Sequence, residues 1–279
     1  MAPNLSCRIA YQGEPGAFSE EAALLLAPSA TLAPCHYFPE LFASTREARA
    51  DLILAPIENT LAGAVTDSYD LLLHSGLFIT AEVILPIHHQ LIVSPGTKLS
   101  SIRTVLSHGV ALAQCRRFFA LHPALQPKPA HDTAGSVREM IAGGDTSVAA
   151  IASERASGIY GGEILLRNIE DSPHNFTRFL LLSEFENPGI ESTAEESKFS
   201  LAVRLKFVSL LPAMLAQAMS KGAKLVNLVS RPAIDAPWNY YFYLDFLGSA
   251  CSNCGDLSQF ASEFKWLGRY RAAAPSQSA

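Results

Sequence analysis

The sequence predicts an α/β protein with a larger two-lobed domain followed by a smaller α+β module. Short apolar runs alternate with helical patterns through the first part of the chain, and this alternation is typical of parallel α/β sheets. The composition changes at Glu184–Ser197, which contains five glutamates, Pro188 and Gly189 without apolar periodicity and therefore predicts a linker. A β-α-β-β-α pattern follows, and its size is that of a split βαβ module.

The larger domain opens with a strand, a glycine-rich turn and a helix. Cys7–Tyr11 is apolar enough for a short buried strand, and Gly13 and Gly16 allow a tight turn after it. Ser19 is a good N-cap for a helix that continues to Leu26. A glycine-rich turn at a helix N-terminus can receive an anion, although an ordinary βα turn has the same pattern.

A second apolar run, Leu52–Ala55, ends at the polar segment that contains Glu58 and Asn59. Polar groups directly after a buried strand lie at the carboxyl end of a sheet, where open α/β folds bind ligands. Farther on, Ile79–Val93 reads as extended, with Pro86 at an edge or at a crossing between lobes.

Two adjacent histidines, His88 and His89, lie within the extended segment that follows Pro86. Neighbouring residues on a strand face opposite ways, so we do not expect these two to share a metal ion.

The remaining elements continue the alternation. Because the chain makes a long excursion and then returns, we expect two lobes with a cleft between them, which is a common ligand site. The expected strands are Arg103–Ser107, Lys128–Asp132, Val148–Ile151, Ile164–Ile169 and a buried strand through Leu180–Leu182, and the expected helices are Ser68–Leu73, one after His108 that contains Gln114, one with Thr133 as a plausible N-cap, and Ser153–Tyr160.

The smaller module has its own set of expected elements. These are strands at Phe199–Leu205, Lys224–Ser230 and Tyr240–Phe246 and helices at Leu211–Ser220 and Leu257–Leu267. Within the third strand, Tyr241 and Tyr243 alternate with Phe242 and Leu244, so we expect both faces of that strand to be covered.

Charge and composition exclude several classes of partner. The chain has 279 residues, a net charge of −5 and no run of Lys or Arg, whereas nucleic-acid or membrane binding needs clustered cations. No signal-peptide pattern and no apolar stretch of roughly 20 residues is apparent. Five scattered cysteines indicate a reducing compartment, and the Cys251–Cys254 CxxC has no second pair, so we expect no metal. We therefore expect a cytoplasmic protein that binds a small molecule.

The stretch Asn175–Phe179 is the strongest candidate for a functional site. Thr177 offers a hydroxyl and Arg178 a guanidinium, and such a pair can hold a carboxylate and help a leaving group depart. A strand entry with Arg178 in solvent has the same sequence, and short motifs often match by chance.

Five segments, in this order and spacing, resemble the prephenate dehydratase family. Each segment alone is a weak signal, but five in this order are a strong one, and the resemblance covers nearly the whole chain. They are Tyr11-Gln12-Gly13 through Phe18-Ser19, Pro56-Ile57-Glu58-Asn59-Thr60, Ser107-His108 with Gln114-Cys115, Asp132-Thr133-Ala134, and Thr177-Arg178-Phe179.

The resemblance implies a domain organisation. A catalytic domain at 1–185 would have the architecture of periplasmic binding proteins, with one lobe at about 1–88 with 176–185 and the other at 89–175. A linker at 186–197 and a ferredoxin-like ACT regulatory domain at 198–279 would follow. Because ACT modules commonly pair, the resemblance also implies a homodimer or homotetramer.

The resemblance further implies a carbon–oxygen lyase of L-phenylalanine biosynthesis, which converts prephenate into phenylpyruvate without a cofactor or metal. Arogenate, with an amine in place of the keto group, is the alternative substrate, and one sequence does not decide between them. A non-catalytic amino-acid-sensing protein is an alternative of a different class, and a solute-binding transport protein is a third.

Four residues are catalytic candidates by resemblance. Thr177 would donate to the leaving hydroxyl, and Glu58 would supply a proton or orient Asn59. Asn59 and Gln114 would be neutral donors. Arg178 would clamp a carboxylate with its planar fork. The substrate-binding candidates are Arg178, Phe179, Ser107, His108, Thr133, Thr60, Gly16 and Phe18; a structural role is the alternative for His108, and core packing for both phenylalanines.

The smaller module departs from the family at the effector loop. Ser209-Leu210-Leu211 stands where the family has Gly-Ala-Leu, and Val229 stands where a Glu precedes Ser230-Arg231-Pro232. The added side chain crowds a backbone approach, and the lost carboxylate removes a charge from the effector region. We therefore expect the L-phenylalanine response to be weakened or absent, unless neighbouring residues compensate.

Overall fold

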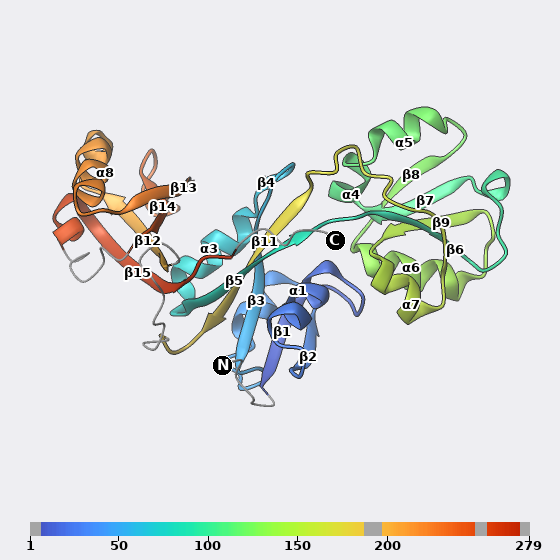
Figure 1. The fold of residues 1–279 in the computed structure, drawn as a ribbon, viewed down its shortest axis with the longest axis horizontal. Coiled ribbons are helices and arrows are strands. Elements are labelled where there is room, and N and C mark those ends of the chain that lie inside the picture. The colour runs from blue at the N-terminus through green and yellow to red at the C-terminus, as the bar shows by residue number, and fades with distance from the viewer. Residues whose placement is uncertain (1–6, 187–196, 249–255, 274–279) are drawn as a thin grey trace. The chain divides into compact units, whose positions relative to one another are not determined.

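The computed structural model describes residues 7–186, 197–248 and 256–273 (Figure 1). These residues fall into two compact units, 7–63 with 83–179 and 64–82 with 180–273. Strands β5 (Phe78–Pro86) and β11 (Phe176–Ser183) each contribute residues to both units. Most of the predicted linker, and both Cys251 and Cys254, lie outside the described residues.

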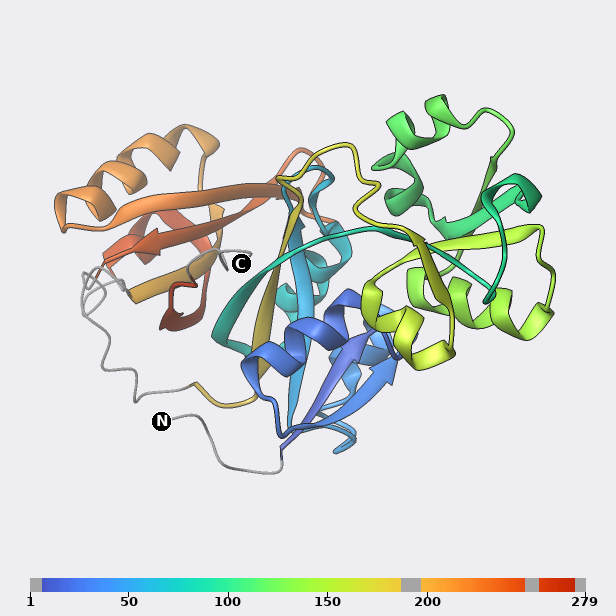
Figure 2. The ribbon, with the colours of Figure 1, turned by 45° about the vertical axis from the view of Figure 1, so that its right-hand side comes forward.

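The fold is mixed α/β, as predicted. The first sheet has six strands in the order β2-β1-β3-β11-β5, with β4 beside β3, and β1 pairs in parallel with β2 and β3. Helix α1 covers β1 and β3 (Figures 1 and 2). The bounds are β1 Arg8–Gln12, α1 Phe18–Leu26, β2 Thr31–Cys35, α2 Phe38–Ala43, β3 Leu52–Asn59 and β4 Gly63–Ala64.

The second sheet, in the first unit, has the order β10-β6-β9-β7-β8. Strand β7 runs parallel to β8 and β9, but β6 runs antiparallel to β9 and β10, so the expected parallel sheet is only partly present. The bounds are β6 Gln90–Val93, β7 Thr104–His108, α4 Gly109–Ala113, α5 Arg116–Leu121, β8 Gln126–Ala130, α6 Thr133–Gly143, β9 Val148–Ala152, α7 Glu154–Tyr160 and β10 Glu163–Leu166.

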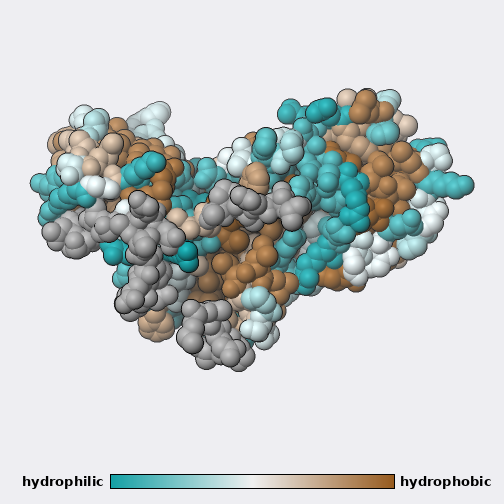
Figure 3. All heavy atoms as spheres, in the orientation of Figure 1, coloured by the Kyte–Doolittle hydropathy of each residue, from teal (hydrophilic) through white to brown (hydrophobic). Residues whose placement is uncertain are grey.

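The surface of this sheet's helical layer includes an apolar area. Leu121, at the end of α5, is 78% exposed, and hydrophobic side chains gather over α5 in Figure 3. Single exposed leucines are common on protein surfaces and need no partner.

Two local predictions in the first unit were wrong. Helix α1 begins at Phe18 after Ala17, so Ser19 lies buried in the first turn and is not the N-cap. Asp132, and not Thr133, caps α6, because its carboxylate accepts the N–H of Gly135 at 2.7 Å. A carboxylate is the stronger acceptor for an unpaired helix N–H and also suits the positive end of the helix dipole.

In the second unit, four antiparallel strands have the order β13-β14-β12-β15. Helix α8 covers one face, where Phe242, Leu244 and Phe246 enter a buried apolar cluster with Met214. The bounds are β12 Ser197–Leu205, α8 Leu211–Ser220, β13 Lys224–Pro232, β14 Tyr240–Leu247 and β15 Ala261–Arg271.

Helix α3 (Thr66–Ser75) contacts the other face of this sheet. The Tyr243 hydroxyl donates to the main-chain oxygen of Tyr69 at 2.9 Å, and the two rings lie 4.8 Å apart. Lys265 Nζ contacts the carbonyl oxygens of Leu72 and Leu73 near the helix C-terminus, where a cation is favoured. The prediction that β14 is covered on both faces is therefore confirmed.

The helix expected at Leu257–Leu267 is wrong, because β15 occupies most of that range. Strand β15 pairs with β12 along its length, for example Phe264 with Val203 and Trp266 with Leu201. The Trp266 ring also stacks on Phe199 at 5.9 Å. This pairing joins segments far apart in the sequence, and such packing overrides a local helical pattern.

Gly16, in the turn before α1, is held against α7. Its φ is +89°, and a Cβ added there would lie 2.7 Å from the Cα of Ala156. Its N–H donates to Glu20 Oε2 at 2.8 Å, and its carbonyl accepts from the Ser153 hydroxyl at 2.6 Å. Only glycine combines this backbone conformation with this close approach.

We predict that Gly16→Ala lowers the free energy of unfolding by about 2 kcal/mol or more, because it adds backbone strain and a clash with main chain. Gly143→Ala is the matched control, since Gly143 ends α6 and a Cβ there would meet nothing within 4 Å. Urea unfolding of both variants measures the difference. Equal stability of the two variants would contradict the role of Gly16.

Candidate active site

Asn59, the last residue of β3, is the fixed point of a buried hydrogen-bond network. Its Oδ1 accepts from the main-chain N–H groups of Leu61 at 2.9 Å and Ala62 at 2.8 Å. A main-chain nitrogen can only donate, so these two bonds identify which end of the side-chain amide is oxygen and which is nitrogen.

The nitrogen of Asn59 therefore faces the start of β11. The two protons of Nδ2 are shared among three oxygens, namely Asn175 Oδ1 at 2.8 Å, the main-chain oxygen of Phe176 at 3.1 Å and Thr177 Oγ1 at 3.0 Å. The bond to Thr177 uses a lone pair of the hydroxyl oxygen and leaves its proton available to another acceptor.

Gln114, the C-cap residue of α4, also belongs to the network, and α4 directly follows β7 of the second sheet. Its Nε2 donates to Asn59 Oδ1 at 3.2 Å, and its Oε1 accepts from Asn175 Nδ2 at 2.9 Å. The same Oε1 lies 2.8 Å from Nε2 of His89. Because Gln114 presents oxygen to the ring, His89 Nε2 must carry the proton.

His89 is 2% exposed, and within residues 7–186, 197–248 and 256–273 its Nδ1 has no hydrogen-bond partner. Burial lowers the pKa of His89 below the usual value for histidine, so the ring is neutral. Phe18 packs edge-on against the ring, with centroids 5.7 Å apart. Glu170 holds the main chain here, since one oxygen accepts the His89 N–H at 2.9 Å and the other lies 2.8 Å from His88 Nδ1.

Asn59, Gln114 and Thr177, three of the four catalytic candidates, are thus joined in one network. Glu58 precedes Asn59 on β3, and because side chains alternate between the faces of a strand, we expect the two to project to opposite sides of the sheet. The same alternation on β11 separates Arg178 from Thr177. Phe179 lies on the Thr177 side and is buried, as its core-packing alternative expects.

Several substrate-binding candidates have structural partners within the protein. The Ser107 hydroxyl is fully buried and donates to the Ile151 carbonyl at 2.6 Å, which ties β7 to β9. Thr60 Oγ1 donates to the His174 carbonyl at 2.8 Å and also accepts the Phe176 N–H. His108 caps α4, and burial lowers its pKa.

The glycine-rich turn is also occupied by its own side chains. The Glu14 N–H donates to Asp132 Oδ2 at 3.1 Å, and Gly16 donates to Glu20. Two carboxylates therefore use the donors that an anion would need, and the ordinary βα turn is the better interpretation.

His89 was not predicted to belong to the network, and Asn175 was predicted only as part of the Asn175–Phe179 stretch, without a role of its own. His89 was placed on a continuous strand, but residues 87–89 lie between β5 and β6. Pro86, already interpreted as a possible crossing point, was the signal that the strand ends there.

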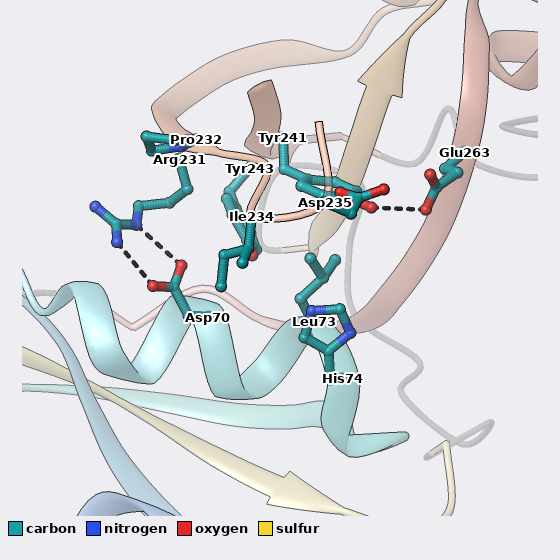
Figure 4. Close-up of a pocket in the computed structure, with 10 residues that line it drawn as sticks. All are labelled: Asp70, Leu73, His74, Arg231, Pro232, Ile234, Asp235, Tyr241, Tyr243 and Glu263. Atoms are coloured by element: carbon teal, nitrogen blue, oxygen red, sulfur yellow. Dashed lines mark hydrogen bonds and ion pairs between the residues drawn. The ribbon is translucent and has the colours of Figure 1, made fainter. Parts of the chain in front are cut away.

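The second unit contains a separate cavity of about 480 Å³ (Figure 4). Arg231 forms a two-pronged ion pair with Asp70 of α3, at 3.0 and 2.7 Å, and this pair raises the pKa of Arg231. On another wall, Glu263 accepts from the Tyr241 hydroxyl at 2.7 Å. The other lining residues are Leu73, His74, Pro232, Ile234, Asp235 and Tyr243.

The described part of the chain lacks both a metal-binding cluster and a membrane-spanning helix. No group of three or more His, Cys, Asp or Glu side chains is arranged to hold a metal ion. No helix there combines the length and apolar character needed to cross a membrane.

Comparison with known proteins identifies the family. The sequence model of prephenate dehydratase matches residues 9–187. The chain belongs to the prephenate dehydratase family. "Arogenate dehydratase/prephenate dehydratase 1, chloroplastic" of Arabidopsis thaliana is 36% identical over 286 residues, which cover 94% of this chain and 71% of that protein.

Two solved structures are similar over nearly the full chain. Prephenate dehydratase from Arthrobacter aurescens, in complex with L-Phe, has a TM-score of 0.85 and 29% identity, and the match covers 98% of this chain and 92% of that one. GqqA, described as a novel type of quorum quenching acylase, has a TM-score of 0.84 and 32% identity, with 95% and 98% covered.

We predict that Asn59→Asp lowers the free energy of unfolding by about 3 kcal/mol at neutral pH, because a buried carboxylate cannot donate to the oxygens that Nδ2 now meets. The loss should shrink as the pH falls, since a proton restores one donor. Asn239→Asp, at an exposed position, makes the same charge change as a control. Urea midpoints from pH 8 to pH 5 test this, and parallel behaviour of the two variants would contradict it.

Proposed function

We propose that this protein catalyses the decarboxylating dehydration of prephenate or arogenate in phenylalanine biosynthesis. The observation that carries the proposal is the bond from Asn59 Nδ2 to Thr177 Oγ1, at 3.0 Å, which leaves the threonine proton available to a leaving oxygen. Membership of the prephenate dehydratase family and the names of the plant relatives support the same reaction.

The chemistry asks little of the enzyme beyond orientation and charge stabilisation. The bond from the ring to its carboxylate breaks, its electron pair enters the ring, and the carbon–oxygen bond at the opposite ring carbon breaks. Carbon dioxide departs, and the hydroxyl leaves as water after it gains one proton. Thr177 is too weak an acid to transfer its proton outright, so it stabilises the departing oxygen by a hydrogen bond.

Glu58 and Arg178 have less support as partners of Thr177. The alternation of β3 and β11 directs both side chains to the face opposite Asn59 and Thr177. We therefore assign leaving-group assistance to Thr177, and the roles of Arg178 as a carboxylate clamp and Glu58 as a proton source stay predictions.

The finer architecture is also part of this proposal. We propose a two-lobed catalytic domain of the periplasmic-binding-protein type at 1–185 and an ACT domain at 198–279, supported by two sheets formed by the strands from β1 to β11 and an antiparallel sheet with α8 in the second unit. The clustering of 64–82 with 180–273 differs from this division of the chain. A dimer or tetramer and a cytoplasmic location stay predictions; the Arabidopsis relative is named as chloroplastic.

The GqqA neighbour suggests acyl cleavage as a competing activity. A threonine nucleophile needs a base that accepts its proton. Here the nearest fixed partner of the Thr177 oxygen is an amide N–H of Asn59, which donates and cannot accept. The site therefore favours hydrogen-bond donation by Thr177 over nucleophilic attack.

A turnover assay tests the function. Purified protein is incubated separately with prephenate, with arogenate and with an N-acyl amino-acid amide, and phenylpyruvate, phenylalanine and released amine are measured. We expect product from prephenate or arogenate only. No product from either would contradict the proposal and favour a non-catalytic amino-acid sensor, and released amine alone would favour the acylase.

We predict that Thr177→Ala lowers kcat by about 100-fold or more and changes KM little, because the lost hydrogen bond strengthens as charge develops on the leaving oxygen. Thr177→Ser keeps the hydroxyl and serves as the matched control, with kcat expected within about tenfold of the parent protein. An unchanged kcat in the alanine variant would remove Thr177 from the mechanism.

L-phenylalanine is the proposed effector, supported by the L-Phe complex of the Arthrobacter aurescens protein. The Ser230-Arg231-Pro232 segment ends β13, but the Arg231 guanidinium is already held by Asp70 (Figure 4). An effector carboxylate that needs the Nε–Nη2 edge of Arg231 must displace Asp70, which gives a second reason, besides Ser209–Leu211 and Val229, to expect a weak response.

We predict that Asp70→Asn tightens L-phenylalanine binding by about fivefold, since it removes the carboxylate that competes for Arg231. Glu263→Gln changes a carboxylate of the same cavity that pairs with Arg204 and is the control. Isothermal titration calorimetry measures both. Equal affinity of the two variants would show that Arg231 does not receive the effector carboxylate.

A further inference from the structure

The hydrogen bonds around Asn59 have a direction that can be followed from main chain to hydroxyl. Leu61 and Ala62 fix the Asn59 oxygen, so the group that Gln114 turns toward it must be the donor nitrogen. Gln114 then presents its oxygen to Nε2 of His89. Each assignment follows from the one before it, and none depends on how the amide ends were chosen.

We infer that His89 is a positioning residue: its Nε2–H anchors Gln114 and, through Gln114 and Asn59, fixes the hydroxyl of Thr177. This inference rests on the proposed function for its kinetic consequences. The series runs from His89 Nε2 to Gln114 Oε1 at 2.8 Å, from Gln114 Nε2 to Asn59 Oδ1 at 3.2 Å, and from Asn59 Nδ2 to Thr177 Oγ1 at 3.0 Å.

The environment of His89 suits a fixed neutral donor. A proton on Nδ1 would be a buried donor without a described partner, which costs more than a bare nitrogen at the same place. The Phe18 ring restrains the imidazole plane, and Glu170 restrains the main chain through the His89 N–H. The ring is therefore held in one orientation and one tautomer.

Neighbouring charges do not change this assignment. Burial and the charge of His88 disfavour the charged form of the His89 ring, whereas the Glu170 carboxylate favours that form. Burial has the largest influence on the pKa of His89. The carboxylate of Glu170 is already engaged by the His89 N–H and by His88, on the main-chain side of the residue.

Removal of the ring frees one end of Gln114. Its oxygen would keep only the bond from Asn175, so the Gln114 amide would be held less firmly. Gln114 and Asn175 both bond the Asn59 amide, so the direction of the Asn59 N–H toward Thr177 would be less well defined. A displacement of about 1 Å in a positioning group can reduce turnover by about 100-fold.

Four substitutions separate this role from a role in folding. His89→Gln retains an N–H donor that reaches Gln114, whereas His89→Asn is polar but too short, and His89→Leu fills the space without a donor. His88→Gln is the matched control, because the His88 ring is 39% exposed and pairs with Glu170. Circular dichroism and thermal unfolding establish that each variant is folded.

We expect kcat to fall by about 100-fold in His89→Leu and His89→Asn with KM within about threefold, and His89→Gln to stay within about tenfold of the parent protein. His88→Gln should stay within about twofold. Equal losses in His89→Gln and His89→Asn would overturn the inference, because the donor to Gln114 would then be irrelevant.

A double variant tests the route through Gln114. In a Gln114→Ala background, His89→Leu should cost little further kcat, since the intermediary is already gone. Full additivity of the two losses would overturn the inference. If the parent protein turned over neither prephenate nor arogenate, the proposed function would fail on its own.

Nitrogen NMR provides a readout that does not depend on turnover. In protein labelled with ¹⁵N-histidine, the signals lost in His89→Gln identify His89. Near neutral pH these signals should show a protonated Nε2 and a bare Nδ1. A proton on Nδ1, or a charged ring, would overturn the inference even in an active enzyme.

Discussion

The two main-chain N–H groups that hold the Asn59 oxygen are the constraint on which the site depends. Side-chain amides are nearly symmetric in shape, so an isolated Asn–Gln–Asn cluster can satisfy its hydrogen bonds in more than one arrangement. The main chain at Leu61 and Ala62 has no such freedom. It selects one arrangement for Asn59, and the partners of Asn59 must adopt the arrangement that matches.

This selection determines what Thr177 can do. Its oxygen accepts an N–H from Asn59, so the hydroxyl behaves as a donor toward a third group. A donor of this kind stabilises negative charge on an oxygen without a change in its own charge, and it acts best where water is excluded. The arrangement suits a reaction whose driving force lies in the substrate and whose difficult moment is the departure of an oxygen.

The association of Asn59, Gln114 and Thr177 could be predicted from the sequence, whereas the place of His89 could not. Asn59, Gln114 and Thr177 come from three separate segments whose order and spacing match one family, so their association could be predicted. The place of His89 depends on where β5 ends, and the bounds of a strand are set by pairing that the local sequence does not contain. The strand β15 was missed for the same reason, because its partner β12 lies about sixty residues away.

The alternation of side chains along a strand has its clearest consequence at β3 and β11. On β3 it is expected to direct Glu58 away from the face that Asn59 occupies, and on β11 to direct Arg178 away from the face of Thr177. Sequence proximity had made the hydroxyl and the guanidinium look like parts of one site. Residues of adjacent strands contact one another when their side chains share a face, and here these are Asn59 and Thr177.

Leu61 and Ala62, which fix Asn59, are followed after a few residues by α3, the helix that contacts Arg231 of the proposed effector segment. Gly63 ends the first unit at this point of the chain, and α3 begins at Thr66 in the second. Helix α3 is held there by Arg231 on Asp70, by Tyr243 on Tyr69 and by Lys265 at its C-terminal carbonyls. A ligand that draws Arg231 away from Asp70 removes one of these restraints from a helix only a few residues from the N–H groups of Leu61 and Ala62.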